Sequence, residues 1–415
     1  MTVGCTIVAR NYLPYAHVLA DSWRRHHRGL PLYVLVIDAE DGDVTEADGL
    51  EVLAPSVLGL PDRELARMGA IYNAPELTTA LKAHLLRHLL EDGADVVIFV
   101  DSDVDLHTEL TVVVPLAEQR GIVLSPCLLQ PLPIDGLSPS ETDLGVTGLY
   151  SSGLIAVGPA GRPFLDWWAD RVRRDCLFSD SGGMHADQRW LDFVPSCFDH
   201  AILRDPGVNV SHWNLHERRI GHQDGRYTVN GGPLRAFHFS GYDPRVPGVV
   251  SPASWQRPVR FDVAPGSALQ HLCLDYGARL AQAGYAEARS TSYGYAASAA
   301  GTTLGTWQRR VYRELLIAAE ALGEDVPDPF DAARSDEFER LIGRPGASPL
   351  LSDMAKARLA DLSIAIAIAQ ARSGAPGRLL LATLKVIRRL PGYRRGWMPH
   401  PLPSDRIALE YETAA

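Results

Sequence analysis

The chain contains few cysteines and no long apolar run. Its five cysteines, among 415 residues, are scattered and include no pair at CxxC spacing, which argues against a disulfide framework and a thiolate zinc site. The longest apolar stretch, Leu362 to Ala369, is far shorter than the ~20 residues that span a bilayer. The first residues form an apolar strand pattern without a basic leader, so we expect a cytoplasmic protein with no secretory signal.

Basic residues are outnumbered by acidic ones. The chain has 40 Lys and Arg against 50 Asp and Glu, a formal net charge of -10, which argues against a general nucleic-acid binder. Hydrophobic residues make up 46% and charged residues 22%, an ordinary composition for a folded globular enzyme. A chain of this length is expected to form two or three domains of ~100–200 residues each.

Apolar strands and amphipathic helices alternate in the first part of the chain. A strand pattern at Gly4 to Ala9 is followed by a helix at about Tyr15 to Arg25 and a strand at Leu32 to Ile37. A longer helical pattern, Leu77 to Leu90, precedes a buried strand at Val96 to Val100. This order predicts an α/β fold with a mostly parallel sheet that binds ligands at the carboxyl ends of its strands. Further elements are expected at Gly121 to Leu124, Gly153 to Val157 (strands) and Pro163 to Arg174 (helix).

The pattern changes after about residue 265, where alanine-rich helical stretches are separated by glycine and proline. We therefore expect an α/β domain over residues 1–265 and a helical C-terminal region over residues 266–415. A basic, partly amphipathic segment at 378–395 is predicted either to pack on its own domain or to make peripheral contact with an anionic membrane. The expected helices are Ala268 to Gln282, Thr306 to Leu322, Asp331 to Leu341 and Met354 to Ala371.

Two aspartates directly follow the buried strand that ends at Val100. In an extended strand, residues i and i+2 project to the same side, so Asp101 and Asp103 would offer an oxygen-rich site for Mg²⁺ or Mn²⁺. Such a cation neutralises the charge that grows on a leaving diphosphate. Aspartate is also common in turns and helix caps after strands, so this pattern alone is weak. Asp105 is a third acid that either shares this role or is a solvated turn residue.

A second pattern lies far downstream, where His238 stands between Phe237 and Phe239 and is followed by Gly241. An isolated histidine between aromatic residues is more often a packed core residue than a ligand. Together with the upstream aspartates, a third metal ligand becomes the better interpretation. Gly241 would allow backbone amides to approach a phosphate closely.

The strand leading into Asp101-Ser102-Asp103, together with His238 and Gly241, resembles bacterial glycosyltransferases of the GT-A fold, a Rossmann-like nucleotide-diphospho-sugar transferase fold. The chain is similar to the retaining glycogenin-like and lipooligosaccharide galactosyltransferase-type enzymes over most of residues 1–265. This resemblance implies a metal-dependent hexosyltransferase that uses a nucleotide-sugar donor, with a UDP-sugar expected. The acceptor would be a glycan, a lipid-linked molecule or a small molecule, and transfer would proceed with retention.

The resemblance also implies roles for individual side chains. Asp101, Asp103 and His238 would bind Mn²⁺ or Mg²⁺, and Gly241 would lie against the diphosphate. The resemblance further implies a set of donor-binding residues. For those in the first strand-to-helix loop and for Asp38 the alternative role is loop capping, and for Lys82 it is a solvated position on a helix surface. The expected donor-binding residues are Ala9, Asn11, Tyr12, Asp38, Lys82 and Ser102.

The same resemblance places Asp187 at the donor hydroxyls and Gln188 close to the anomeric carbon, as the catalytic pair. A helix N-cap is the alternative for Asp187. The chain departs from the family pattern at two places. Related enzymes often carry Asn before Gly153, where this chain has Ser152. Several also carry a Lys six residues after the histidine, where this chain has Pro followed by Arg245, which is expected to contact the diphosphate instead.

Two other functions compete with glycosyl transfer. A haloacid-dehalogenase-like phosphatase also has an apolar strand before an Asp-x-Asp motif, although the later lysine and metal-binding acids of that superfamily are missing from the expected places. A non-catalytic nucleotide-sugar-binding protein would retain the same fold. The sequence does not indicate an oligomeric state.

Overall fold

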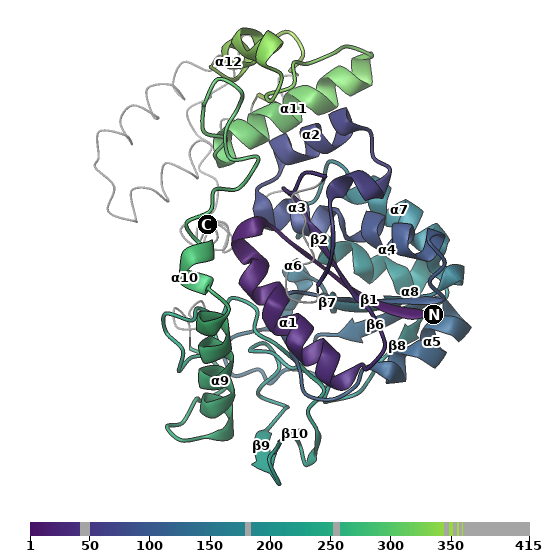
Figure 1. Cartoon of the computed structure of the whole chain (residues 1–415), viewed down its shortest axis with the longest axis vertical. Coiled ribbons are helices and arrows are strands. Elements are labelled where there is room, and N and C mark those ends of the chain that lie inside the picture. The colour runs from purple at the N-terminus through teal and green to yellow at the C-terminus, as the bar shows by residue number, and fades with distance from the viewer. Residues whose placement is uncertain are drawn as a thin grey trace. The chain divides into compact units, whose positions relative to one another are not determined.

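The computed structural model describes residues 1–41, 50–178, 184–251, 258–343, 348–351, 355–356 and 359 (Figure 1). The basic segment 378–395 and most of the helix expected at Met354 to Ala371 lie outside the described residues. The chain divides into two compact units. The first unit comprises Met1–Gly59, Thr78–Cys176 and Gly183–Tyr293, and the second comprises Leu60–Leu77, Leu177–Gly182 and Gly294–Ala415. The expected boundary after residue 265 stays a prediction, because compactness does not test which residues the α/β domain needs.

A seven-stranded sheet lies at the centre of the first unit, in the order β3-β2-β1-β4-β7-β6-β8. Strand β1 pairs in parallel with β2 and β4, and β6 pairs in parallel with β8, whereas β7 is antiparallel to both of its neighbours. The predicted α/β fold with a mostly parallel sheet is therefore confirmed. The strands are β1 (Thr2–Val8), β2 (Leu32–Val36), β3 (Glu51–Leu53), β4 (Val96–Val100), β6 (Ile122–Pro126), β7 (Tyr150–Val157) and β8 (Ala201–Ile202).

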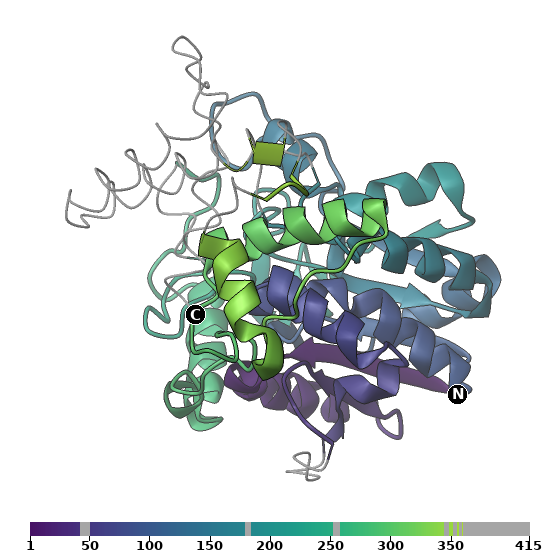
Figure 2. The same cartoon turned by 90° about the horizontal axis from the view of Figure 1, so that it is seen from above.

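Helices cover both faces of this sheet (Figures 1 and 2). Successive side chains of β4 point to opposite faces of the sheet and pack against different helices. Val96, Ile98 and Val100 belong to the buried cluster that includes residues of α1 (Leu13–His26). Phe99 faces the other side, where the Lys82 Nζ atom of α4 (Lys82–Glu91) lies 4.8 Å from its ring centroid. A strand that is buried on both faces is thus apolar at every position, as expected for a central strand.

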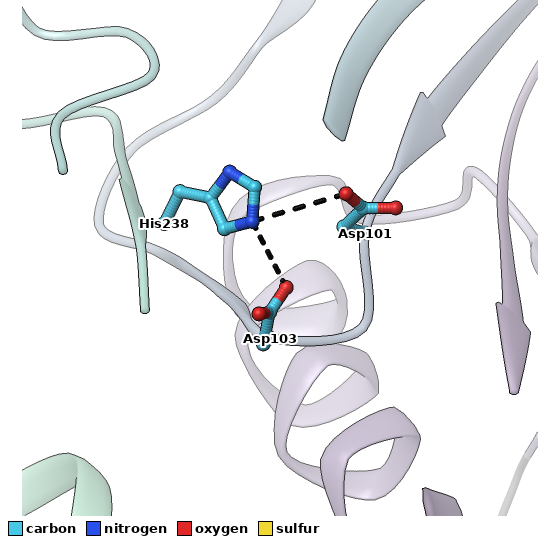
Figure 3. Close-up of side chains that lie close together, drawn as sticks. All are labelled: Asp101, Asp103 and His238. Atoms are coloured by element: carbon cyan, nitrogen blue, oxygen red, sulfur yellow. Dashed lines mark ion pairs between the residues drawn. The ribbon is translucent and has the colours of Figure 1, made fainter. Parts of the chain in front are cut away.

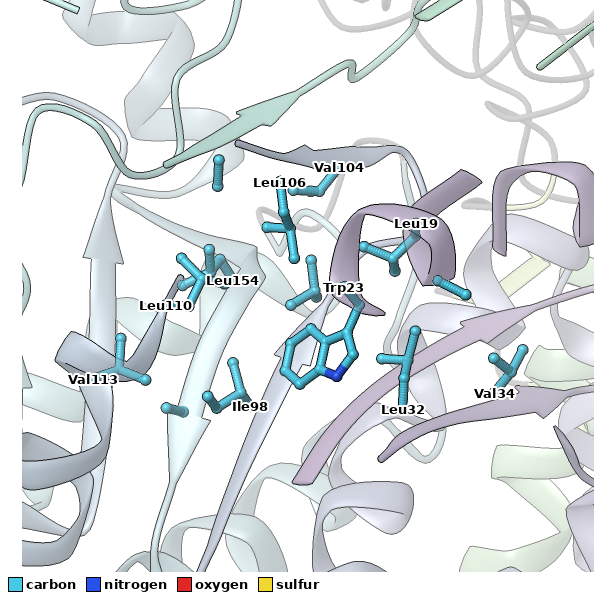
Figure 4. Packing of buried hydrophobic residues seen from close by; sticks show 14 of the residues in the cluster. Leu19, Trp23, Leu32, Val34, Ile98, Val104, Leu106, Leu110, Val113 and Leu154 are labelled. Atoms are coloured by element: carbon cyan, nitrogen blue, oxygen red, sulfur yellow. The ribbon is translucent and has the colours of Figure 1, made fainter. Parts of the chain in front are cut away.

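Trp23 fixes the packing of α1 on the sheet (Figure 4). Its indole lies against β1, where a β-carbon on Gly4 would overlap the ring, so glycine at this position makes room for the helix. The indole Nε1 donates a hydrogen bond to the Leu30 carbonyl at 2.9 Å. His27 stacks on the same indole at 4.0 Å between ring centroids, and its Nε2 accepts a hydrogen bond from the Leu110 amide at 2.8 Å.

The single helix predicted over Leu77 to Leu90 is wrong in its continuity, because two helices, α3 (Ala74–Ala80) and α4, meet at Leu81. Leu81 and Lys82 are both buried. The spacing of apolar residues does not reveal this break, because the residues on both sides of it are also buried and the apolar pattern continues through it.

Short β-strands and helices complete the first unit. Strand β5 (Val104–Leu106) follows β4 after three residues and pairs in antiparallel orientation with β12 (Ala236–His238). A three-stranded sheet contains β9 (Ile220–Gln223), β10 (Arg226–Val229) and β11 (Gly232–Pro233). The remaining α-helices of this unit are α5 (Val114–Arg120), α6 (Glu141–Thr147), α7 (Arg162–Val172), α8 (Val194–Cys197), α9 (Ala268–Gln282) and α10 (Tyr285–Ala288).

The second unit includes α2 (Asp62–Ile71), α11 (Thr306–Leu322) and α12 (Ser335–Gly343). Arg309 of α11 is buried, and its guanidinium donates hydrogen bonds to carbonyl oxygens at the end of α2, including those of Gly69 and Tyr72 at 2.6 Å each. Carbonyls in the last turn of a helix have no partner within the helix, so this arginine satisfies them. No helix in the described part of the chain is long and apolar enough to cross a membrane.

Candidate active site

The two aspartates lie in a tight turn at the carboxyl end of β4. The Asp101 amide donates to the Gly153 carbonyl of the neighbouring strand β7 at 2.9 Å, and the Val104 amide donates back to the Asp101 carbonyl at 3.0 Å. The chain therefore turns through Asp101, Ser102 and Asp103 before β5 begins, and all three side chains are half-buried. This is the edge of an α/β sheet at which ligands bind.

The pairing of β5 with β12 brings His238 to these aspartates. His238 lies opposite Val104 in the register, and the Phe239 amide donates to the Asp103 carbonyl at 2.8 Å. The His238 Nε2 atom lies 3.1 Å from Asp103 Oδ1 and 3.8 Å from Asp101 Oδ2 (Figure 3). The three residues predicted as metal ligands thus converge on one point.

The three side chains fit a divalent cation. One ligand atom from each of Asp101, Asp103 and His238 lies within 4.8 Å of the others. Two carboxylates and an imidazole suit Mn²⁺, and the carboxylates also suit Mg²⁺. Gly153 keeps the space beside them open, because a β-carbon there would lie 2.5 Å from His238 Cε1 and 2.6 Å from Asp101 Oδ2.

Asp103 and His238 each stabilise the charged form of the other side chain. Burial disfavours the ionised form of Asp103, but the adjacent imidazole outweighs it and lowers the pKa of this carboxyl below its usual value. Burial also disfavours a charged imidazole, but Asp103 and then Asp101 raise the pKa of His238. The buried His238 and the half-buried Asp103 therefore form a pair of opposite charge.

Strand β7 is irregular beside this cluster. Ser125 of β6 pairs with Ser151, whereas the preceding Leu124 pairs with Ile155, so residues 152–154 of β7 have no partner on β6. Such irregularities re-aim side chains and are frequent next to active sites. Here the unpaired residues include Gly153, which makes room for the metal ligands, and Ser152, which contacts the charged network described next.

Lys82 is the centre of a buried charged network. Its side chain is 2% exposed, and its Nζ atom lies 3.1 Å from Asp101 Oδ1 and 3.1 Å from Asp187 Oδ2. The same atom donates to the carbonyl and hydroxyl oxygens of Ser152 at 3.2 Å each. Burial opposes the charge on Lys82, but Asp101 and Asp187 outweigh it and raise its pKa above the usual range. The alternative of a solvated helix lysine is wrong, whereas contact with donor phosphates stays a prediction.

Asp187 and Gln188 lie on either side of the start of η5, a 3₁₀ helix (Gln188–Phe193). Asp187 occupies the N-cap position but makes no side-chain capping bond, and it accepts instead from the Ser152 hydroxyl at 3.1 Å. Burial raises the pKa of Asp187 despite the nearby Lys82. The Gln188 Oε1 atom accepts from the Ser152 amide at 3.3 Å, and its Nε2 donates to the Thr147 carbonyl at 2.9 Å. The predicted catalytic pair is thus fixed beside the metal cluster.

The residues predicted to hold the nucleoside lie in the first strand-to-helix loop. Ala9 precedes η1 (Arg10–Tyr12), and its carbonyl accepts from the Tyr12 amide at 2.8 Å. Asp38 accepts from the Arg10 amide at 2.9 Å, so it fixes this loop from the end of the neighbouring strand. The buried Asn11 Oδ1 atom has no hydrogen-bond partner among the described residues. Nucleoside binding by these residues stays a prediction.

Gly241 and Arg245 follow His238, the histidine predicted to bind the metal. Gly241 has φ of +69°, a left-handed conformation that glycine adopts without strain. The Arg245 side chain is 60% exposed, and its guanidinium contacts both carboxylate oxygens of Asp243, with Nη2 to Oδ2 at 2.7 Å. Donor contact by Arg245 stays a prediction and would require the guanidinium to bind phosphate while it neighbours this carboxylate.

Both interpretations offered for Asp105 are wrong, because it is neither a metal ligand nor a solvated turn residue. Asp105 is buried in β5, accepts from Arg279 Nη1 of α9 at 2.9 Å and lies 3.1 Å from His107 Nε2. Burial opposes its charge, but His107 and Arg279 outweigh it and lower its pKa well below the usual range. The sequence could not reveal this pair, because the two partners are 174 residues apart.

Gly153 and Trp213 contact the site but were not assigned roles from the sequence. The Trp213 ring meets the His238 ring edge to face at 5.3 Å, with an interplanar angle of 88°. A glycine within an apolar strand pattern is a signal of close approach by another group, which would have pointed to Gly153. Trp213 lies in an irregular segment whose composition indicates site-forming loops without indicating which residue faces the site.

Comparisons with known proteins give distant relatives. No family model matches the chain. It is 25% identical over 247 residues to the uncharacterized protein YfnF of Bacillus subtilis (strain 168), covering 57% of this chain and 80% of that protein. It is 24% identical over 255 residues to YfnD of the same organism, covering 57% of this chain and 76% of that protein.

Solved structures that the chain is similar to include three glycosyltransferases. Galactosyltransferase LgtC, solved with donor and acceptor sugar analogs, matches 67% of this chain and 95% of its own at 14% identity, with a TM-score of 0.40. The glycosyltransferase GlyE of Streptococcus pneumoniae TIGR4 matches 68% and 63% at 11% identity and a TM-score of 0.39. A glycosyltransferase involved in glycosylation of the major capsid of PBCV-1 matches 58% and 94% at 10% identity and a TM-score of 0.34.

Proposed function

We propose that this chain is a metal-dependent glycosyltransferase of the GT-A type that moves a hexosyl group from a UDP-sugar to an acceptor with retention. The observation that carries this proposal is the convergence of Asp101, Asp103 and His238 at the carboxyl end of β4, directly beside the buried Lys82 network. The proposed domain for this activity is residues 1–265. The acceptor class is a glycan, a lipid-linked molecule or a small molecule.

The metal ligands suit a leaving diphosphate. Asp101, Asp103 and His238 would hold Mn²⁺ or Mg²⁺, which supplies positive charge where the diphosphate gains negative charge. Gly241, with its left-handed backbone, follows His238 after two residues and leaves the backbone accessible to phosphate oxygens. These features support a diphosphate as the group that the site binds.

The sugar end of the donor would lie against Asp187 and Gln188. Asp187 is held by Lys82 and Ser152, so its carboxylate is preorganised to accept hydrogen bonds from donor hydroxyls. A carbonyl oxygen has two lone pairs. Gln188 Oε1 accepts one hydrogen bond, from the Ser152 amide, and retains capacity to stabilise an electron-poor anomeric carbon. In a retaining transfer, the donor phosphate would then accept the proton of the attacking hydroxyl.

Donor hydrolysis tests this proposal. The purified chain is incubated with a panel of UDP-sugars and Mn²⁺, and released UDP is measured. We expect slow UDP release by the wild-type protein, a loss of at least about 100-fold in Asp103→Asn and His238→Gln, and an unchanged rate in the control Asp170→Asn, which changes an exposed carboxylate of α7. Release that survives a chelator or these substitutions would overturn the metal-dependent mechanism.

The same assay separates the competing functions. A phosphatase would release inorganic phosphate from phosphate monoesters, and a non-catalytic binding protein would be stabilised thermally by its nucleotide sugar without releasing UDP. Once an acceptor is found, the NMR coupling constant of the product anomeric proton distinguishes retention from inversion. An inverted product would contradict the role proposed for Gln188.

A further inference from the structure

A pocket of about 220 Å³ lies at the same edge of the sheet as the metal ligands. It is formed where β6 ends, where the antiparallel β7 begins and where β8 ends, which is the edge at which β4 delivers Asp101. Its walls are mostly apolar, and two polar side chains join them. The residues that carry the argument are Leu128, Leu144, Leu149, Ile202, Tyr150 and Arg204.

Trp213 contacts both the lining of this pocket and one of the predicted metal ligands. Trp213 packs against the buried cluster of Cys127, Leu132 and Leu144, two of whose members also line the pocket. The same indole also meets the His238 ring edge to face. The pocket is therefore next to the proposed reaction site and not on a remote surface.

Gln188 provides a second connection between the two sites. Its side chain spans from the Ser152 amide to the Thr147 carbonyl, at the end of α6. Helix α6 contributes Leu144 to the pocket, and Leu149 and Tyr150 follow it directly. A molecule in the pocket would thus lie against α6 and the start of β7, the two elements that the Gln188 side chain contacts through Thr147 and Ser152.

The pocket combines apolar walls with one cationic side chain. Arg204 is exposed, donates to the Leu129 carbonyl at 3.1 Å, and has no ion-pair partner in the described part of the chain. A guanidinium carries five N–H donors, so most of them are available to an anion. Leu149 is 52% exposed, so part of its apolar side chain is accessible to a molecule that enters the pocket.

Tyr150 adds a neutral hydrogen-bond donor. Burial raises the pKa of its phenol, Asp192 raises it further, and Arg204 opposes both effects. The hydroxyl therefore keeps its proton at neutral pH and remains able to donate to an anionic group beside Arg204.

We propose that this pocket binds the acceptor, and that the acceptor is an amphiphile with an apolar chain or ring next to a phosphate or carboxylate group. This inference rests on the proposed function. The apolar part would fill the pocket, which exceeds the ~150 Å³ of an engineered cavity that takes a benzene ring. The anionic group would pair with Arg204 and Tyr150. In the transfer, the acceptor O–H bond breaks, its oxygen bonds to the anomeric carbon, and the nucleoside diphosphate leaves with the proton.

Calorimetric titration of the full chain with decyl phosphate, below its micelle concentration and without donor or metal, tests the pocket. Decanol and inorganic phosphate serve as probes that carry only the apolar part or only the charge. We expect each of them to bind at least about tenfold more weakly than decyl phosphate. Arg204→Gln should raise the Kd for decyl phosphate at least about tenfold and Leu149→Gln about threefold. The matched control Arg226→Gln, at an exposed position on β10, should change it less than twofold.

Equal Kd values for wild type and Arg204→Gln, or inorganic phosphate that binds as tightly as decyl phosphate, would overturn the inference. UDP release distinguishes this failure from failure of the proposed function. A protein that releases UDP but does not bind decyl phosphate keeps its proposed function and loses the inference. A protein that binds decyl phosphate through Arg204 but never releases UDP contradicts two assignments. It contradicts the proposed glycosyltransferase function, and with it the assignment of the pocket to an acceptor.

Discussion

Gly153 lies directly against His238, so that a β-carbon on residue 153 would come within 2.5 Å of the imidazole Cε1 atom. The same β-carbon would lie 2.6 Å from Asp101 Oδ2. The irregular segment of β7 thus places a residue without a side chain where two of the three predicted metal ligands need room. A substitution at this glycine tests the metal site without removing any ligand.

We expect Gly153→Ala to weaken Mn²⁺ binding by roughly tenfold or more, because the added methyl displaces His238 and Asp101 from their positions. Thermal-shift titration with Mn²⁺ measures the apparent Kd. Gly145→Ala is the matched control, because a β-carbon at residue 145 meets no atom within 4 Å. Equal Mn²⁺ affinity in both variants would show that the ion binds elsewhere.

Lys82→Met should destabilise the protein by about 3–5 kcal/mol, because it leaves Asp101 and Asp187 without the cation that lies between them. Urea unfolding followed by circular dichroism measures the change. Arg162→Met removes an exposed ion pair with Glu91 and should cost no more than about 1 kcal/mol. A Lys82→Met protein as stable as wild type would mean that the network contributes nothing to the fold.

Arg279→Met should also be destabilising, by about 3 kcal/mol, because it leaves the buried carboxylate of Asp105 in β5 with His107 as its remaining charged partner. The double variant Asp105→Leu/Arg279→Met removes both charges and should regain most of this loss. A double-mutant cycle in urea gives the coupling energy. If the two single effects simply add, the ion pair between Asp105 and Arg279 contributes no coupling energy to stability.

Stability should fall as the pH decreases below the ordinary histidine pKa. Burial lowers the pKa of His27 from 6.5 to about 4, and its Nε2 must stay unprotonated to accept from the Leu110 amide. The unfolded chain therefore takes up a proton in the window from about pH 6.5 to about pH 4, where the folded chain does not. This effect lowers the free energy of unfolding by ~1–2 kcal/mol between pH 7.5 and pH 5.

The variant His27→Gln isolates this contribution. A glutamine oxygen can accept the Leu110 amide at any pH, so the variant should lose less stability than wild type between pH 7.5 and pH 5 in parallel urea titrations. Identical pH dependence of the two proteins would assign the acid sensitivity to other groups.

The sequence predicted the parts of the site that lie within single segments. The apolar residues of β4 indicate a buried strand, and the two aspartates after it follow from strand geometry. His238 could be predicted as a metal ligand only in combination with the upstream aspartates, because a histidine between two phenylalanines has the local pattern of a core residue. Its position beside Asp103 depends on the pairing of β5 with β12, which joins distant parts of the chain and has no local signal.

Other features could not be predicted for related physical reasons. The direction of β7 depends on whether the chain enters the sheet at the amino or the carboxyl ends of the neighbouring strands. The pattern of apolar residues is the same for parallel and antiparallel strands, so it does not predict this direction. Lys82 was predicted to face the donor, but its neighbours Asp187 and Ser152 come from remote segments. Asp105 was misinterpreted because short spacing from two metal ligands suggested a shared role, whereas its partner Arg279 lies on a helix near the end of the first unit.

Strand β12 supplies its histidine from a part of the chain that the ribosome makes long after Asp101 and Asp103. A nascent chain that stops before residue 236 has both carboxylates but lacks the imidazole and the strand that holds β5 in place. Ion capture by all three ligands therefore waits until the polypeptide has closed this pairing. During synthesis, the predicted metal site can therefore form only after His238 has been added to the chain, while the first unit still continues to Tyr293.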